Sequence, residues 1–286
     1  MYIESNGLRF HVRDEGEGEP VLLLHGYPDS SRLWRCQVPA LTAAGFRAVA
    51  PDLRGFGESD RPDGVASYAL PNIVGDVLGI LDALGIERAN VVGHDWGSVV
   101  GWALAAMMPS RVARLVALTV GHPSGFFTDP MGQRERSWYI LFYQHAGLAE
   151  EALRRDDWRL FRQLGRGEGD VDAHLRDLDR PGALTAALNW YRANAPAEAF
   201  GVANPMPLPP VSCPVLGVWP ARDPFLGEAQ MLASAEHCQG GWRYERVDDV
   251  GHWIPLDAPD LLNRLVLGFL QEACAGSPAG SEAVRS

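Results

Sequence analysis

The segment Val91-Val92-Gly93-His94-Asp95-Trp96-Gly97-Ser98 links an apolar run to a helix-forming stretch. Its Gly-x-Asp-x-Gly pattern has the spacing of a nucleophile elbow, a sharp strand-to-helix turn that exposes the central side chain above a sheet. The flanking glycines permit this turn because they lack a Cβ. The same pattern is compatible with a simpler role for Asp95, since Asp often caps the helix that follows it. The rest of the chain must therefore decide between the two interpretations.

Strand-like and helix-like segments alternate on both sides of this turn. Strand-like segments lie at residues 8–13, 21–24, 46–50, 89–92, 114–120, 215–219 and 242–247, and those at 21–24 and 46–50 are apolar runs typical of buried strands. Helical patterns lie at residues 31–44, 70–84, 98–108 and 261–273. Because strands that alternate with helices form parallel sheets covered on both faces, the sequence predicts an α/β fold with a mostly parallel, doubly wound sheet.

The alternation stops over residues 124–205, which contain many aromatic residues and helix formers but no strand-like run. We interpret this stretch as an inserted helical cap. The chain returns through the proline-rich segment 204–210, so the α/β core consists of residues 1–123 and 206–275. Residues 276–286 are almost all small or polar, which predicts a disordered tail.

Composition and charge exclude several classes of function. The 286-residue chain has a formal net charge of -11 and no basic run, so nucleic acid and anionic membrane surfaces are poor partners. No signal peptide precedes the first strand, and no apolar stretch approaches the roughly 18 residues of a membrane span, which predicts a cytoplasmic protein. The four cysteines lack CxxC or metal-ligand spacing. We expect no metal and no cofactor, and a homo-oligomer is compatible with the sequence.

Two further residues follow predicted strands in the order that a hydrolytic triad requires. Asp223 follows the strand at 215–219, and His252 follows the strand at 242–247. Each has an ordinary explanation, because Asp before Pro forms turns and a single His is often a core residue. In hydrolases with an elbow, however, the nucleophile comes first in the chain, the acid second and the histidine last. The joint occurrence of Asp95, Asp223 and His252 therefore favours a catalytic triad with Asp95 as nucleophile.

Three segments resemble those of α/β-hydrolase-fold epoxide hydrolases: His25-Gly26-Tyr27-Pro28, Asp52-Leu-Arg-Gly-Phe-Gly-Glu-Ser-Asp60 and Gly93-His94-Asp95-Trp96-Gly97. The resemblance extends over nearly the whole chain and implies the α/β-hydrolase fold. Haloalkane and fluoroacetate dehalogenases share this framework and its Asp nucleophile, so they remain an alternative. Against them, this chain has Tyr27 where haloalkane dehalogenases usually have Asn or another donor, and Trp96 where fluoroacetate dehalogenases have Arg.

The cap segments 137–144 and 188–194 resemble the two segments that supply a pair of tyrosines in epoxide hydrolases. The matched positions are Tyr139 and Tyr191. A phenol at each position would hydrogen-bond the epoxide oxygen and protonate it as the ring opens, because an alkoxide is a poor leaving group. Tyr143 lies at helical spacing from Tyr139, and we expect it to be an ordinary packing residue.

The resemblance implies a two-step reaction that converts an epoxide and water to a vicinal diol. Asp95 attacks an epoxide carbon and forms an alkyl-enzyme ester. His252, oriented by Asp223, then activates water to hydrolyse the ester, while the backbone N–H groups of Tyr27 and Trp96 stabilise the oxyanion. Because His252 must be neutral, activity is expected to fall at acid pH. A binding protein on a hydrolase scaffold is a third alternative, although it would be expected to lack a member of this set.

Aromatic residues predict the chemistry of the substrate pocket. Six of them are expected to line the space between cap and core: Trp34, Phe126, Phe127, Trp138, Trp190 and Trp253. An aromatic, apolar pocket favours a lipophilic alkyl or aryl epoxide as the small-molecule partner.

Overall fold

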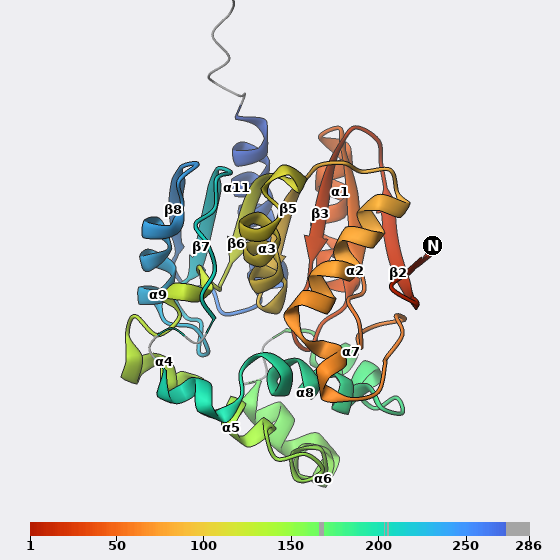
Figure 1. Ribbon diagram of the computed structural model, residues 1–286, viewed down its shortest axis with the longest axis vertical. Coiled ribbons are helices and arrows are strands. Elements are labelled where there is room, and N and C mark those ends of the chain that lie inside the picture. The colour runs from red at the N-terminus through yellow and green to blue at the C-terminus, as the bar shows by residue number, and fades with distance from the viewer. Residues whose placement is uncertain (166–168, 203, 205, 273–286) are drawn as a thin grey trace, which may run out of the picture.

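The computed structural model describes residues 1–165, 169–202, 204 and 206–272, and its centre is an eight-stranded sheet (Figure 1). The strands follow the order β1-β2-β4-β3-β5-β6-β7-β8. Strand β2 is antiparallel to both of its neighbours, and all other neighbouring strands are parallel. This arrangement confirms the predicted mostly parallel sheet. The strands are β1 (Tyr2–Ser5), β2 (Leu8–Glu15), β3 (Glu19–Leu24), β4 (Phe46–Pro51), β5 (Ala89–His94), β6 (Val112–Leu118), β7 (Val215–Pro220) and β8 (Trp242–Val247).

Helices follow most of the parallel strands, as the alternation predicts. The expected helix at 31–44 is divided, because a 3-10 helix at Ser31–Arg35 precedes α1. The expected helix at 98–108 begins earlier, at Trp96, because the elbow passes directly into it. The short helices α9 and α10 were not predicted. The helices are α1 (Gln37–Ala43), α2 (Leu70–Ala83), α3 (Trp96–Met107), α4 (Pro130–Arg136), α5 (Trp138–Tyr143), α6 (Leu148–Leu164), α7 (Val171–Leu178), α8 (Ala183–Asn194), α9 (Glu228–Ala233), α10 (Ile254–Asp257) and α11 (Pro259–Gln271).

The central strands are buried on both faces. In β3, Leu22 and Leu24 pack with residues of α2 and α3, whereas Val21 and Leu23 pack with residues of α1 and α11. Successive side chains of a strand point to opposite faces, so a continuous apolar run is needed where helices cover both. Figure 1 shows α2 and α3 on the near face of the sheet and α1 and α11 on the far face. Because β3 and β5 are parallel neighbours, the loops that follow them emerge side by side.

The described residues between β6 and β7, here called the helical insertion, contain helices α4 to α8 and no strand. These helices run along the edge of the sheet where the parallel strands end (Figure 1). The division into core and cap domains stays a prediction, and the predicted tail at 276–286 lies outside the described residues. Within the described part of the chain, every helix is too short or too polar to cross a membrane.

Candidate active site

Asp95 occupies the turn between β5 and α3. Its backbone angles, φ 53° and ψ -123°, are rare for a residue with a side chain. Gly97 makes the turn possible, since a Cβ at that position would collide with the backbone carbonyl of Leu24. The hydroxyl of Ser98 braces the turn by donating to the carbonyl of Gly93 at 2.8 Å. Asp95 is thereby held at the end of the sheet, where it is only 9% exposed.

Two backbone N–H groups hold the carboxylate of Asp95. The N–H of Tyr27 donates to Oδ1 at 2.8 Å, and the N–H of Trp96 adds a second hydrogen bond. Gly26 allows this approach, because a Cβ there would collide with the carboxylate. Burial raises the pKa of Asp95 to about 6, although the charge of His252 and these hydrogen bonds oppose the rise. Asp95 is therefore ionised at neutral pH and lies against the N–H groups that the sequence predicts as an oxyanion hole.

The imidazole of His252 lies between two carboxylates. Its Nδ1–H donates to Oδ2 of Asp223 at 2.8 Å, while its Nε2 lies 3.8 Å from Oδ2 of Asp95. Asp223 is fixed in turn, because its Oδ1 accepts from the backbone N–H groups of Phe225 and Leu226 at 2.7 and 3.0 Å. Burial lowers the pKa of His252, but the charge and hydrogen bond of Asp223 and the charge of Asp95 outweigh it and raise the pKa to about 9. The three residues therefore form one contiguous network.

A further buried carboxylate, Asp29, links the helical insertion to this network. Its Oδ1 accepts from the Nε2–H of His174 on α7 at 2.7 Å, and its Oδ2 accepts from the indole N–H of Trp253 at 2.9 Å. Burial opposes ionisation, but His174 and the hydrogen bond from Trp253 outweigh it and lower the pKa of Asp29 to about 2. Asp29 shares a loop with Tyr27, so these contacts tie α7 to the loop that holds Asp95. Asp29 was not identified from the sequence. The only signal for it was an acidic residue in the loop that contains Tyr27.

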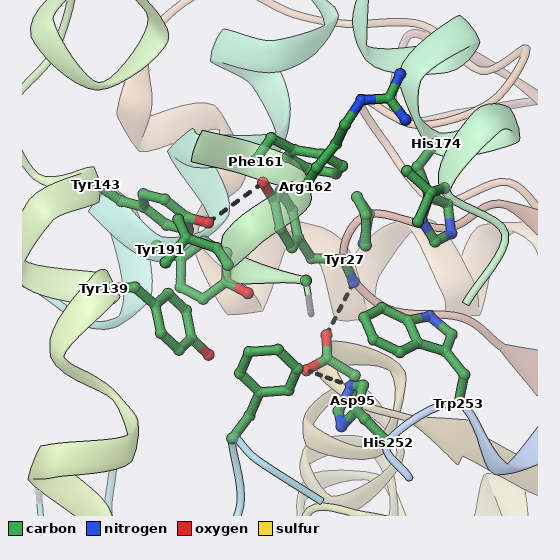
Figure 2. Close-up of a pocket in the computed structure, with 15 residues that line it drawn as sticks. Tyr27, Asp95, Tyr139, Tyr143, Phe161, Arg162, His174, Tyr191, His252 and Trp253 are labelled. Atoms are coloured by element: carbon green, nitrogen blue, oxygen red, sulfur yellow. Dashed lines mark hydrogen bonds and ion pairs between the residues drawn. The ribbon is translucent and has the colours of Figure 1, made fainter. Parts of the chain in front are cut away.

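Helices α5 and α8 bring Tyr139 and Tyr191 to the cavity that contains Asp95. Figure 2 shows both hydroxyls pointing toward the carboxylate. The ring centroids of the two tyrosines lie 6.0 Å apart. Burial, reinforced by the negative charge of Asp95, raises the pKa of each phenol well above its ordinary value. Both phenols are therefore protonated at neutral pH and able to donate.

The buried guanidinium of Arg192 connects α8 to both α5 and α6. Arg192 of α8 donates to both carboxylate oxygens of Glu150, at 2.8 and 3.0 Å, and to the backbone carbonyl of Tyr143 at 2.8 Å. Tyr143 ends α5 one helical turn after Tyr139, and Arg192 is next to Tyr191 in the chain. The hydrogen bond from the guanidinium to the end of α5 therefore links the two helices that carry Tyr139 and Tyr191.

Two pockets meet at Asp95, Tyr139 and Tyr191, which line both of them. The first pocket is also lined by Tyr27, Tyr143, Phe161, His174, His252 and Trp253. The second pocket is enclosed mainly by apolar side chains, among them Val99, Val120, Phe126, Phe127, Phe200 and Met206. A bound molecule centred on Asp95 can therefore extend in two directions.

Three aromatic residues that were predicted to line the pocket lie elsewhere. Trp34 is fully buried between the sheet and helices α1 and α11, and Trp138 is 51% exposed. Trp190 points into the core, where its indole N–H donates to a backbone carbonyl at 3.0 Å. Phe126 lines the second pocket and Trp253 the first. The prediction was wrong for the first three because residue type indicates an apolar neighbourhood but not the direction of the side chain.

Tyr143 is buried in the hydrophobic core, as expected of a packing residue, and it also lines the first pocket. Tyr139 and Tyr143 share the inner face of α5, because residues four apart lie on the same side of a helix. Trp138, one position away, faces outward. The hydroxyl of Tyr143 lies 3.5 Å from the hydroxyl of Tyr27. The helical spacing of Tyr139 and Tyr143 in the sequence already indicated that the two tyrosines share one face of the helix.

The chain is similar to known proteins over nearly its whole length. The family model of the α/β hydrolase fold matches residues 19–259. The AB hydrolase superfamily protein YfhM of Bacillus subtilis is 33% identical over 95% of this chain and 97% of its own length. Epoxide hydrolase A of Mycobacterium tuberculosis is also 33% identical, over 94% of this chain and 96% of its own length. A crystal structure of Bacillus megaterium epoxide hydrolase in complex with an inhibitor, 28% identical, covers 94% of this chain and 99% of that chain with a TM-score of 0.85.

Proposed function

Because this chain belongs to the α/β-hydrolase family of epoxide hydrolases, we propose that it converts an epoxide and water to a vicinal diol. The observation that carries the proposal is the placement of Tyr139 and Tyr191, two protonated phenols that face the buried carboxylate of Asp95. This arrangement suits the opening of a strained ether, in which a nucleophile attacks carbon while the leaving oxygen requires a proton. The apolar second pocket supports a lipophilic substituent on the epoxide.

In the first step, Oδ2 of Asp95 attacks an epoxide carbon. The N–H of Tyr27 holds Oδ1, which leaves Oδ2 to form the new C–O bond. The bond between the attacked carbon and the ring oxygen breaks, and Tyr139 or Tyr191 transfers its hydroxyl proton to that oxygen. The product is a neutral hydroxyalkyl ester of Asp95, and the phenolate recovers its proton from solvent.

In the second step, water attacks the carbonyl carbon of the ester. His252 accepts a proton from this water through Nε2, while its Nδ1–H stays bonded to Asp223. The N–H groups of Tyr27 and Trp96 stabilise the oxyanion. Its collapse breaks the bond to the alkyl oxygen, which takes the proton from His252 and leaves as the diol, and the carboxylic acid left on Asp95 loses its proton to solvent. Since the ester carries no charge, Asp95 no longer raises the pKa of His252, and the resulting fall in that pKa favours the neutral base.

The pH dependence of kcat/KM follows from the first step. Ester formation needs ionised Asp95, whose pKa burial raises to about 6. We therefore expect kcat/KM to fall by about tenfold per pH unit below the pKa of Asp95. Between that pKa and about pH 9, the protonation of His252 should not lower kcat/KM, because a protonated His252 does not block the attack of Asp95 on the epoxide. Diol formation at low substrate concentration, measured across the pH range, checks this. A value that stays constant from about pH 5 to 8 would contradict the assignment of Asp95.

Removal of either proton donor should slow ring opening. Tyr139→Phe and Tyr191→Phe are each expected to lower kcat/KM for an epoxide by about 100-fold, and the double variant by about 1000-fold, since one phenol partly replaces the other. The rings remain, so the packing around Asp95 is retained. Steady-state diol formation is the measurement, with the melting temperature as a check on folding. A double variant within tenfold of wild type would remove the basis of the proposal.

A dehalogenase would use the same Asp95 and His252, but it needs no proton for its leaving group. A single-turnover experiment in H₂¹⁸O tests both functions. The wild-type protein is mixed with a smaller amount of a styrene-type epoxide or a short bromoalkane. In the first turnover, the oxygen added to the epoxide comes from Asp95, so the diol is expected to be unlabelled while ¹⁸O enters Asp95.

The outcomes of this experiment are distinct. Bromide release without diol would identify a dehalogenase, and ¹⁸O in the diol of the first turnover would show direct attack by water instead of an ester. Unlabelled diol with label in the peptide that contains Asp95 supports the proposed function. A cytoplasmic location and a homo-oligomer stay predictions from the sequence.

A further inference from the structure

Two further phenol hydroxyls line the first pocket beside the proposed reaction centre. The hydroxyl of Tyr27, in the loop after β3, lies 3.5 Å from the hydroxyl of Tyr143, at the end of α5. Figure 2 shows these two hydroxyls pointing toward each other. The proposed reaction uses the backbone N–H of Tyr27 but neither of these side-chain hydroxyls.

This pair retains a proton that can be donated to a ligand. Each phenol carries one O–H, and a hydrogen bond between them uses one of the two protons. Burial raises the pKa of both Tyr27 and Tyr143, so both protons are present at neutral pH. Within the described residues, neither hydroxyl has a hydrogen-bond partner other than its counterpart. One O–H therefore remains available to a molecule in the first pocket.

The first pocket offers phenol hydroxyls where the second pocket offers mainly hydrocarbon side chains. A buried hydroxyl with an unused proton costs free energy that a phenylalanine of the same shape would avoid. The second pocket presents such phenylalanines, including Phe126, Phe127 and Phe200. The hydroxyls of Tyr27 and Tyr143 thus give the first pocket an available donor. The side-chain N–H groups of Asn194, which lines the second pocket, already donate to backbone carbonyls.

We propose that the hydroxyls of Tyr27 and Tyr143 form a polar subsite that binds an acceptor oxygen on one arm of the epoxide. Ether, hydroxyl and carbonyl oxygens all fit, because a phenol O–H donates to each of them. The other arm lies in the apolar second pocket. This inference rests on the proposed epoxide hydrolysis and assigns its substrate class: epoxides with an oxygen-bearing substituent on one ring carbon and a hydrocarbon group on the other.

Two matched epoxides test the subsite. Both are trans epoxides with a phenyl group on one carbon, and the other carbon bears either methoxymethyl or propyl, so that a single oxygen replaces a methylene. The double variant Tyr27→Phe/Tyr143→Phe removes both O–H groups and is expected to lower the ratio of kcat/KM for the ether to kcat/KM for the propyl compound by about 3- to 10-fold. Each single variant should lower the ratio less, since one hydroxyl remains that can donate to the ether oxygen. The backbone N–H of Tyr27 is kept in all three variants.

A matched control removes a tyrosine hydroxyl away from both pockets. Tyr244 of β8 donates to Glu228 at 2.7 Å, and Tyr244→Phe is expected to leave the ratio unchanged. If the double variant keeps the wild-type ratio, the subsite is overturned, and a lower melting temperature would then show that the hydroxyls only brace the loop against α5. Wild-type protein that hydrolyses neither epoxide would overturn the proposed function itself, so the two failures are distinguishable.

Discussion

Replacement of Asp95 by Asn is expected to lower kcat for diol formation by about 10⁴-fold or more, because an amide does not form the ester. The substitution removes the nucleophile and keeps the shape of the side chain. Asn is also among the residues that best tolerate a positive φ, so the elbow, with φ 53° at this position, should be retained. The measurement is diol formation over hours, with mass spectrometry to verify that the amide has not reverted to Asp.

The stability of this variant provides its control. Burial raises the pKa of Asp95. At pH values above the ordinary pKa of an Asp side chain, the ionised carboxylate therefore lowers the stability of the folded protein. At neutral pH the amide of Asn removes this loss of stability. The lost attraction between Asp95 and His252 offsets part of the gain. We therefore expect a melting temperature equal to or above that of wild type. Loss of activity together with a lower melting temperature would point to a damaged elbow, and residual activity above a tenth of wild type would contradict the role of Asp95.

The sequence predicted this network because each of its members lies just beyond the end of a strand. Asp95 follows β5, while Asp223 and His252 lie in the loops after β7 and β8. The strand patterns in the sequence indicate where the strands end, and a parallel sheet brings those ends to one edge. The contacts among the three residues therefore follow from local patterns and the topology of the sheet. Helix α3 begins at Trp96, two residues before the predicted start, because the helix follows the strained turn at Asp95 directly.

The geometry of the helical insertion was less predictable. Trp138 and Tyr139 are neighbours of similar chemistry, yet only Tyr139 lines the pockets, because successive helical positions are rotated by about 100°. The contact between Asp29 and His174 joins positions 145 residues apart, and no periodic pattern relates the loop after β3 to α7. Which face of each helix meets the sheet depends on these long-range contacts, so residue type alone assigned Trp34 and Trp190 to the wrong surroundings.

Replacement of His252 by Ala is expected to stop the reaction after its first step. Steady-state turnover should fall by about 10⁴-fold or more, while ester formation on Asp95 continues, because only hydrolysis of the ester needs the imidazole. Incubation with a styrene-type epoxide should therefore add the mass of the intact epoxide to the peptide that contains Asp95. The adduct should form about 1000-fold more slowly when Tyr139 and Tyr191 are also replaced by Phe. Intact-protein and peptide mass spectrometry measure both results.

The pH of this experiment matters because His252 and Asp95 interact. The charge of His252 lowers the pKa of Asp95, so removing the imidazole raises that pKa further above about 6. Incubation at about pH 8 keeps the nucleophile ionised in the variant. An adduct from a short bromoalkane alone, in a parallel sample, would identify a dehalogenase. If wild type turns over one of these compounds but the folded variant forms no adduct with it at this pH, Asp95 is not the nucleophile. If wild type turns over neither compound, the choice of substrates is wrong.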